Sequence, residues 1–297
     1  MLGCNGQVGW ELQRSLAPLG EVVALDRRGG VWNGHPVCGD LGDLDGLAQT
    51  VRTLQPQVVV NAAAHTAVDK AESEPALAHR LNAEAPGVLA REAQTLGAWL
   101  VHYSTDYVFD GQGDAPWGVD APTGPLGVYG RSKLAGEEAV RQACERHLLL
   151  RTSWVYAARG GNFAKTMLRL ARERERLSVV NDQWGAPTGA DLIADVTAAA
   201  LRQVLQTGRG AGTYHLAAAG FTTWHGYANH VINAAKQRQP GGGWVVQAVD
   251  PVPSSAFPTP AKRPHNSRLD TTRLRHTFGV HLPDWRQGVD RLLAETL

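Results

Sequence analysis

The sequence of 297 residues predicts an α/β fold built on a doubly wound parallel sheet. A Gly-rich loop, Gly3 to Gly9, opens a helical stripe at the start of the chain. Short apolar runs such as Gln57–Ala64 and Ala98–Tyr103 suit strands that are buried on both faces. Segments with helical spacing alternate with these runs. This alternation predicts parallel strands that bind ligands at their carboxyl ends.

Composition and charge exclude several classes of partner. Hydrophobic residues make up 43% of the chain, which is ample for a large core, and the net charge is +1. Without a basic surplus, nucleic acid and anionic membranes are not expected as main partners. Cys4, Cys38 and Cys144 lack metal-ligand spacing, so we expect a reducing, cytoplasmic compartment. No apolar run is long enough to span a membrane or to act as an export signal.

The Gly-rich loop is typical of a pyrophosphate-binding turn. Glycines let the backbone approach the phosphates, which then rest on the N-terminus of the following helix. Only Met1 and Leu2 precede this loop, so most of the expected first strand is absent from the printed sequence. A sheet that lacks a central strand leaves strand edges unpaired, so we expect a version extended by about five apolar residues to melt at a higher temperature.

The next strand, Glu21–Asp26, ends in an acid. An acid at this position accepts a hydrogen bond from the adenosine ribose of a dinucleotide, although Asp26 could also be a turn or cap residue. Arg27 and Arg28 could pair with a 2′-phosphate. We therefore expect NADH to be accepted and NADPH not to be excluded.

The following segments extend the alternation. We expect a surface loop over Gly29–Pro36, a short third strand over Val37–Leu41 and a helix over Leu44–Leu54, which Asp40 could cap. A loop follows at His65–Asp69, and a helix over Ala76–Thr95 carries Asn82.

Tyr129 and Lys133 are the central catalytic candidates. They lie one turn apart at the start of a helical run, so they share one helix face and the Lys charge would favour the Tyr phenolate. A Tyr of lowered pKa can exchange a proton with an alcohol or alkoxide. The alternative is a solvated Lys beside a half-buried Tyr. Ser104 and Thr105 end the preceding strand and add hydroxyl groups.

The second half of the chain predicts a smaller substrate-binding lobe. Helices are expected at 162–173 and 190–205, a strand at 213–216, and strand-like residues at 244–249 within a Gly-, Pro- and Ser-rich stretch. We predict a dinucleotide-binding domain over residues 1–151 with a returning segment at about 189–219, and a discontinuous lobe over 152–188 and 220–297.

Together these motifs resemble the extended short-chain dehydrogenase/reductase family, and within it the nucleotide-sugar reductases. The resemblance implies a Rossmann-type fold and NAD(P)H-dependent reduction of the 4-keto group of dTDP-4-dehydro-L-rhamnose, the last step toward dTDP-L-rhamnose for cell-surface polysaccharide. The motifs that carry it cover nearly the whole chain: the GxxGxxG loop, Asn61–Pro75, Ser104–Gly111, Tyr129-x-x-x-Lys133, Arg151–Tyr156, Asn162–Met167, Asn181–Thr188 and Arg263–Asp270.

The resemblance also implies roles for individual residues. Tyr129 would be the general acid, Lys133 would bind the nicotinamide ribose and lower the pKa of Tyr129, and Thr105 would hydrogen-bond the ketone. The cofactor would contact Gly3, Gly6, Gln7, Val8, Gly9, Asp26, Asp40, Leu41, Ala63, Ala64, His65, Tyr103, Tyr129 and Lys133. The substrate would contact Thr66, Val68, Thr105, Asp106, Trp154, Arg263 and Asn266, with Ser267 beside them.

Further expectations concern metals and charge. Arg263 could bond a diphosphate bidentately or form a surface salt bridge. His65 and His215 are expected to be hydrogen-bonded residues rather than metal ligands. Some relatives hold Mg²⁺ with acidic residues at a homodimer contact, and Glu11, Asp191 and Glu295 are the possible equivalents here.

Other reactions and roles stay open. Dehydratases with this scaffold follow the catalytic Thr with Asp-Glu, whereas Asp106-Tyr107 follows Thr105 here, which favours ketone reduction over elimination. An epimerase is not excluded. A second hypothesis is a dinucleotide-binding partner protein similar to the regulatory subunit of methionine adenosyltransferase. The intact Thr105, Tyr129 and Lys133 set favours an enzyme.

Overall fold

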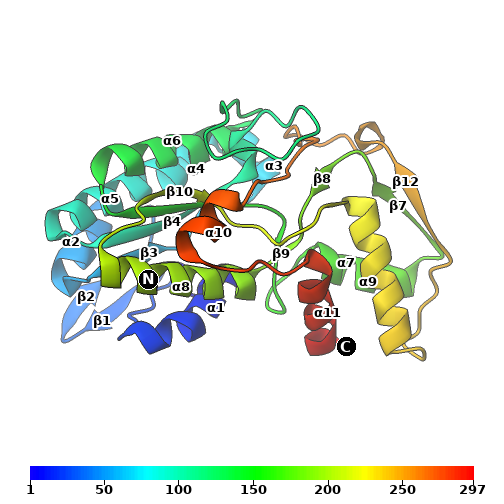
Figure 1. Ribbon diagram of the computed structural model, residues 1–297, viewed down its shortest axis with the longest axis horizontal. Coiled ribbons are helices and arrows are strands. Elements are labelled where there is room, and N and C mark those ends of the chain that lie inside the picture. The colour runs from blue at the N-terminus through cyan, green and yellow to red at the C-terminus, as the bar shows by residue number, and fades with distance from the viewer.

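The computed structural model describes residues 1–297 and confirms the predicted parallel sheet (Figure 1). Four strands lie in the order β10, β5, β4, β3, and each neighbouring pair is parallel. Their bounds are β3 Val58–Asn61, β4 Trp99–Thr105, β5 His147–Thr152 and β10 Gly212–His215.

Helices cover both faces of this sheet. Successive residues of a strand face opposite sides, so Val59 and Val60 belong to different hydrophobic clusters. The cluster of Val60 contains residues of α1 (Gln7–Leu16) and α8 (Ala190–Thr207), and that of Val59 contains residues of α2 (Leu44–Leu54), α5 (Ala85–Leu96) and α6 (Val128–Ala143). The sheet is therefore doubly wound.

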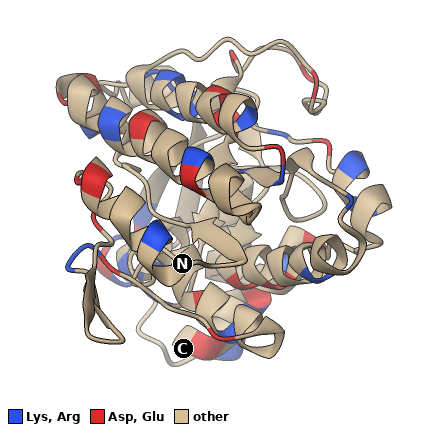
Figure 2. Ribbon diagram, turned by 90° about the vertical axis from the view of Figure 1, so that its left-hand side faces the viewer, with Lys and Arg blue, Asp and Glu red and all other residues tan.

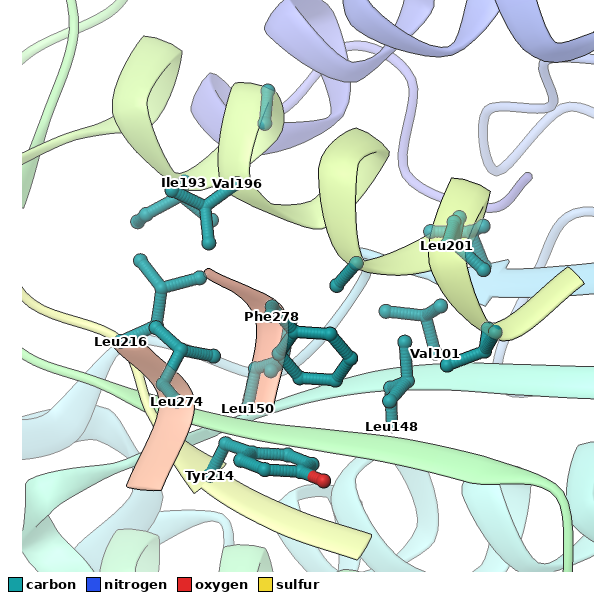
Figure 3. Close-up of a cluster of buried hydrophobic side chains, with 14 of the residues drawn as sticks. Val101, Leu148, Leu150, Ile193, Val196, Leu201, Tyr214, Leu216, Leu274 and Phe278 are labelled. Atoms are coloured by element: carbon teal, nitrogen blue, oxygen red, sulfur yellow. The ribbon is translucent and has the colours of Figure 1, made fainter. Parts of the chain in front are cut away.

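Helix α10 (Thr272–Phe278) belongs to the core beside the sheet. Its side chains Leu274 and Phe278 lie between α8 and strands β5 and β10, where they meet Leu150 and Ile193 (Figure 3). Its apolar face contributes to this core, so a stretch that we predict for the smaller lobe also packs against the main sheet.

The N-terminal edge of the sheet differs from the prediction. Leu2 forms parallel bridges to both Leu25 and Asn61, and its N–H donates to the Val60 carbonyl at 2.8 Å. In the expected strand over residues 21–26 only Leu25 forms a β-bridge, although the Met1 ammonium also donates to the Val23 carbonyl. An apolar cavity of about 390 Å³ adjoins Met1 and is lined by side chains of both helical layers.

Residues 30–37 form a hairpin rather than a loop and a third parallel strand. Strands β1 (Gly30–Trp32) and β2 (His35–Val37) pair in antiparallel fashion around Asn33 and Gly34, which both have positive φ. The cap of α2 was also assigned wrongly. The Asp43 side chain accepts from the Gly46 N–H, whereas Asp40 accepts from the Gly42 N–H in the preceding turn.

The predicted helix at 76–95 is present but contains a π-helical turn. It consists of α4 (Pro75–His79), the π turn η2 (Arg80–Glu84) and α5. The loop expected at 65–69 ends in a short helix, α3 (Val68–Ser73). Both features lie beside the catalytic helix α6.

The remaining elements gather at the other end of the molecule (Figure 1). Helices α7, α9 and α11 pack around a second hydrophobic cluster that includes Tyr227 and Trp285, and β12 pairs with β7 a few residues after the predicted strand. The division into lobes stays a prediction. The bounds are β6 Val155–Tyr156, α7 Phe163–Glu173, β7 Arg176–Val180, β8 Trp184–Gly185, β9 Thr188–Gly189, β11 Thr222–Thr223, α9 Trp224–Arg238, β12 Ala248–Val252 and α11 Trp285–Thr296, with short 3₁₀ turns η1 Ala17–Leu19, η3 Asp106–Val108 and η4 Ser254–Ala256.

Charged residues of both signs are interspersed over the helices that face the viewer in Figure 2, as the net charge of +1 suggests. None of the helices combines the length and the apolar character that a membrane crossing requires.

Candidate active site

A cleft of about 620 Å³ lies at the carboxyl ends of β3, β4 and β5. The Gly-rich loop and the start of α1 form one part of its lining, and α6 forms another. The residues that line it are Gly3, Asn5, Gly6, Gln7, Val8, Asn61, Ala62, Ala63, Ala64, Thr66, Tyr103, Ser104, Tyr129, Lys133, Thr152, Val155 and Gly160.

The Gly-rich loop is folded tightly enough to require glycine at two positions. Gly3 has a φ of 82°, and a Cβ there would lie 2.7 Å from the Ala63 nitrogen. A Cβ on Gly9 would lie 2.0 Å from the Gly3 carbonyl oxygen. Gly9 therefore packs the helix against the loop and does not line the cleft. This geometry brings the start of α1 to the edge of the cleft.

Three polar side-chain atoms in the cleft wall have no hydrogen-bond partner within the protein. They are Oε1 of Gln7, Oγ of Ser104 and Oγ1 of Thr152, and all three are buried. The Gln7 amide nitrogen donates to the Gly161 carbonyl at 3.0 Å, so the 160–161 loop closes over the Gly-rich loop. Unpaired buried polar atoms favour a polar ligand. The cleft therefore fits a dinucleotide.

Asp26 lies beside the Gly-rich loop, although it does not line the cleft itself. Its carboxylate accepts from the Asn5 amide at 2.8 Å and from the Arg28 guanidinium at 2.7 Å. Hydrogen bonds from Arg28 hold the pKa of Asp26 below its usual range. A carboxylate and a guanidinium therefore lie side by side where the adenosine ribose is expected. Asp40, Leu41 and His65 also lie outside the cleft lining.

The three catalytic candidates come together at the end of β4 and the start of α6. Tyr129 and Lys133 line the cleft, and the Thr105 side chain is near enough to the Tyr129 phenol to influence its pKa. The Thr105 hydroxyl donates to Asp106 Oδ1 at 3.0 Å. Lys133 is 2% exposed, and its Nζ donates to the Tyr103 carbonyl at 2.7 Å. The Tyr103 hydroxyl is hydrogen-bonded to the Thr197 hydroxyl on α8.

The expected effect of Lys133 on Tyr129 is not found. Burial raises the pKa of Tyr129 above its usual 10.0, although the nearby Thr105 side chain acts in the opposite direction. Burial also lowers the pKa of Lys133 to about 8, opposed by the charge of Glu137. The charge of Lys133 is not among the influences that shift the pKa of Tyr129. Tyr129 is therefore protonated at neutral pH, as a general acid must be.

Asn82 organises this region from the π turn, which sequence reasoning did not anticipate. Its side chain accepts from the His65 N–H at 2.8 Å, and its amide nitrogen lies 3.0 Å from both the His65 carbonyl and the Ser132 hydroxyl. Ser132 in turn donates to the Tyr129 carbonyl at 2.8 Å. Asn82 thus ties the loop after β3 to the first turn of α6.

The predicted substrate residues are dispersed around the mouth of the cleft. Thr66 lines it, and Val68 begins α3. Burial raises the pKa of Asp106 to about 6, against hydrogen bonds from Ser267 and Thr105. Arg263 Nη2 lies 2.7 Å from Asp69 Oδ2, so the salt bridge that we considered is formed, while its Nη1 is buried without a partner.

The structure contradicts the expectation that Asn266 contacts the substrate. It is 1% exposed, and its amide nitrogen donates to the Gln112 and Ala115 carbonyls at 3.3 and 2.8 Å. Its side-chain oxygen accepts from the Arg268 side chain at 2.8 Å. Because its hydrogen-bonding groups are used within the protein, Asn266 holds the surrounding loops and is not free to bind substrate.

Trp154 has an unusual backbone. Its φ of 48° is rare for a bulky residue, and its ring stacks on Trp224 with centroids 3.6 Å apart. A Cβ on Gly185 would lie 2.6 Å from the Trp154 ring, so the indole is held between two neighbours. Trp154 follows the cleft residue Thr152 but does not line the cleft itself.

The proposed metal ligands do not form a metal site. Glu11, Asp191 and Glu295 influence one another electrostatically, but no group of three or more potential ligands able to hold a metal ion is present. Arg291 pairs with Asp191 at 3.5 Å and with Glu295 at 3.1 Å, so its guanidinium neutralises two of the three carboxylates. The homodimer stays a prediction. His215 is fully buried, and burial lowers its pKa to about 3.

A Gly-rich nucleotide loop, a doubly wound sheet and a cleft that holds a Tyr and a Lys beside a Thr define an NAD(P)H-dependent oxidoreductase of the Rossmann type. The chain belongs to the family described as the RmlD substrate binding domain, whose model matches residues 1–297.

Named relatives agree with this assignment. The chain is 55% identical to the dTDP-4-dehydrorhamnose reductase of Shigella flexneri and 56% identical to that of Salmonella typhimurium, in each case over 99% of this chain and 96% of the relative. The crystal structure of a dTDP-4-dehydrorhamnose reductase from Bacillus anthracis in complex with NADP is 33% identical, with a TM-score of 0.86 over 99% of this chain and 98% of that one.

Proposed function

We propose that this chain reduces the 4-keto group of dTDP-4-dehydro-L-rhamnose to give dTDP-L-rhamnose, with NADPH or NADH as the reductant. The observation that carries the proposal is the presence of Tyr129 and Lys133 in the wall of the cleft, with Thr105 close to the Tyr129 phenol. Relatives that are 55% and 56% identical over almost the whole chain are named for this reaction.

The protein residues supply proton transfer and orientation. A bound NAD(P)H would supply the hydride for carbon four of the sugar. Tyr129 keeps its proton because burial raises its pKa, and it would donate this proton to the carbonyl oxygen. Thr105 would hydrogen-bond the same oxygen. Lys133, fixed by the Tyr103 carbonyl, would place a positive charge beside the nicotinamide ribose.

Further contacts are proposed for the adenosine end of the cofactor. Asp26 would accept from the ribose hydroxyls, and Arg28 would turn from Asp26 toward a 2′-phosphate when NADPH binds. Arg28 is exposed, so little packing opposes this rotation. Such an arrangement favours acceptance of both dinucleotides.

The nucleotide-sugar contacts are proposed for the mouth of the cleft. Arg263 has a buried guanidinium nitrogen without a partner, which supports a contact to the diphosphate. Asp106 and Ser267 would bind sugar hydroxyls, and Trp154 would pack against the sugar or the thymine. These groups come from segments far apart in the sequence, so the site depends on the complete fold.

Replacing Tyr129 with Phe tests the proposal. We expect Tyr129→Phe to lower kcat by about 10²- to 10⁴-fold, the usual contribution of a positioned general acid. The measurement is the decrease in NADPH absorbance after dTDP-4-dehydro-L-rhamnose is added. NADPH binding, followed by fluorescence titration, should persist.

Tyr214→Phe is a matched control, because Tyr214 on β10 does not line the cleft and its hydroxyl donates to the Gly210 carbonyl at 2.9 Å. This variant should keep most of its activity. If the wild-type protein binds NADPH but does not oxidise it with this substrate, the proposed function is wrong. The partner-protein hypothesis would then be preferred.

A further inference from the structure

Helix α6, which carries Tyr129 and Lys133, is not capped by its own sequence. Its N-cap residue is Gly127, which has no side chain to accept the first free N–H groups. The acceptor comes from another helix. The Glu72 carboxylate on α3 accepts from the Val128 N–H, and its Oε1 lies 2.8 Å from that nitrogen.

The identity of residue 127 agrees with this arrangement. A Cβ on Gly127 would lie 2.5 Å from Glu72 Oε1, so any larger residue would displace the carboxylate. Negative charge at a helix N-terminus is also favoured by the helix dipole. Glycine at this position therefore makes room for a cap supplied from outside the helix.

The donor helix is itself held from the opposite side. Asp69, one turn before Glu72, accepts from the Arg263 guanidinium at 2.7 Å and from the Ala261 N–H at 3.2 Å. Ala71 on the same helix is fully buried. Helix α3 therefore lies between the catalytic helix and the segment that carries Arg263, and both contacts fix its position.

We propose that Glu72 is a positioning residue for the reduction, because it caps helix α6 from α3 and thereby fixes the Tyr129 hydroxyl in the cleft. Val128, which it caps, directly precedes Tyr129. If the first turn of α6 frays, the phenol moves relative to Thr105. Lys133 lies one turn further along and is held separately by the Tyr103 carbonyl. Loss of the cap should therefore affect Tyr129 more than cofactor binding.

The inference rests on the proposed function and predicts a specific kinetic pattern. We expect Glu72→Ala to lower kcat by about ten- to a hundredfold, the usual effect of a small misplacement of a catalytic group. The KM for NADPH should stay within about twofold, since Lys133 and the Gly-rich loop are unaffected. Glu72→Gln keeps an acceptor oxygen and should restore most of the lost kcat.

One control variant and a second test variant make the result specific. Glu138→Ala removes an exposed carboxylate from the same helix α6 and should leave kcat unchanged. Gly127→Ala keeps Glu72 but displaces its carboxylate, so it should reproduce the loss of kcat and serves as the test if Glu72→Ala does not fold.

The outcomes separate this inference from the proposed function. If the wild-type enzyme reduces dTDP-4-dehydro-L-rhamnose and both Glu72→Ala and Gly127→Ala keep their kcat, the positioning role is overturned. Equal losses in Glu72→Ala and Glu72→Gln would also overturn it, because the cap needs only an acceptor. If the wild-type enzyme itself shows no turnover, the proposed function fails.

Discussion

The ammonium of Lys133 lies 2.7 Å from the carbonyl oxygen of Tyr103, and the cleft therefore holds this cation by a backbone contact. Lys133 is almost fully buried, and burial is the main reason for its low pKa. A buried Lys with a pKa near the working pH gives the enzyme a titratable group in the cofactor site. The first prediction concerns this group.

We predict that kcat/KM for NADPH falls as the pH rises through about 8, because Lys133 loses its positive charge there. Below this pH the ammonium is charged and can bond the nicotinamide ribose. The measurement is a pH profile of kcat/KM. In Lys133→Met the profile should lose this alkaline limb, at lower activity. A wild-type profile that stays flat up to pH 10.5, the ordinary Lys value, would contradict the assignment.

Arg28 should decide between the two dinucleotides. We predict that Arg28→Ala raises the KM for NADPH by about ten- to a hundredfold, the equivalent of one lost hydrogen bond to a charged group. The KM for NADH should change little. Steady-state kinetics with each cofactor provide the measurement, and Arg202→Ala, which removes an exposed guanidinium from α8, is the control. Equal effects of Arg28→Ala on both cofactors would show that the guanidinium does not contact the 2′-phosphate.

Glu137 and Arg151 form a buried ion pair behind the active site. Glu137 is 0% exposed and accepts two hydrogen bonds from Arg151, at 2.8 and 2.7 Å. We predict that Glu137→Leu destabilises the protein by about 3–5 kcal/mol, because Arg151 is left buried without a counter-charge. Urea unfolding measures the loss. The double variant Glu137→Leu/Arg151→Met should recover most of it, and a double variant as unstable as the single one would argue against this explanation.

The same pair gives a pH dependence of stability. Burial opposes the charged form of Glu137, but hydrogen bonds and charge from Arg151 prevail and hold its pKa below 4.5. The stabilisation is therefore present above pH 4.5 and is lost as the pH falls through the lower pKa of the folded state. Unfolding measured across the acid range should show this loss in the wild type. The double variant should show a smaller one.

Trp224 should affect the nucleotide sugar through Trp154. The two rings stack at 3.6 Å, and an aromatic pair of this kind contributes about 0.5–1.5 kcal/mol. We predict that Trp224→Leu raises the KM for the sugar nucleotide by about two- to tenfold, because Trp154 loses its support. The KM for NADPH should not change. An unchanged KM for the sugar nucleotide would show that the stacked Trp154 does not contribute to substrate binding.

Local patterns in the sequence were sufficient to predict much of the architecture. Strands β3 and β4 are short apolar runs, and helices α2, α6, α7 and α8 have clear periodicity. Tyr129 and Lys133 could be named as catalytic candidates, because their spacing on one helix face requires no tertiary information. The glycines of the first loop were predictable for the same reason.

Long-range contacts explain what the sequence did not predict. Glu72 caps a helix that begins 56 residues later in the chain, and Asp69 pairs with a residue 194 positions away. Likewise, the role of Asn266 depends on carbonyls more than a hundred positions away. Such pairs leave no periodic signal. The predicted lowering of the Tyr129 pKa was wrong, because burial, which depends on the whole fold, raises this pKa.

The most direct test of the central claim uses NADPH that carries deuterium at both hydrogen positions of carbon four of the nicotinamide. The protein is incubated with this cofactor and dTDP-4-dehydro-L-rhamnose, and the product is analysed by NMR. The account predicts dTDP-L-rhamnose with deuterium on carbon four of the sugar, and almost none from Tyr129→Phe over the same time. A product without deuterium at that carbon, or unreacted sugar beside bound cofactor, would contradict it.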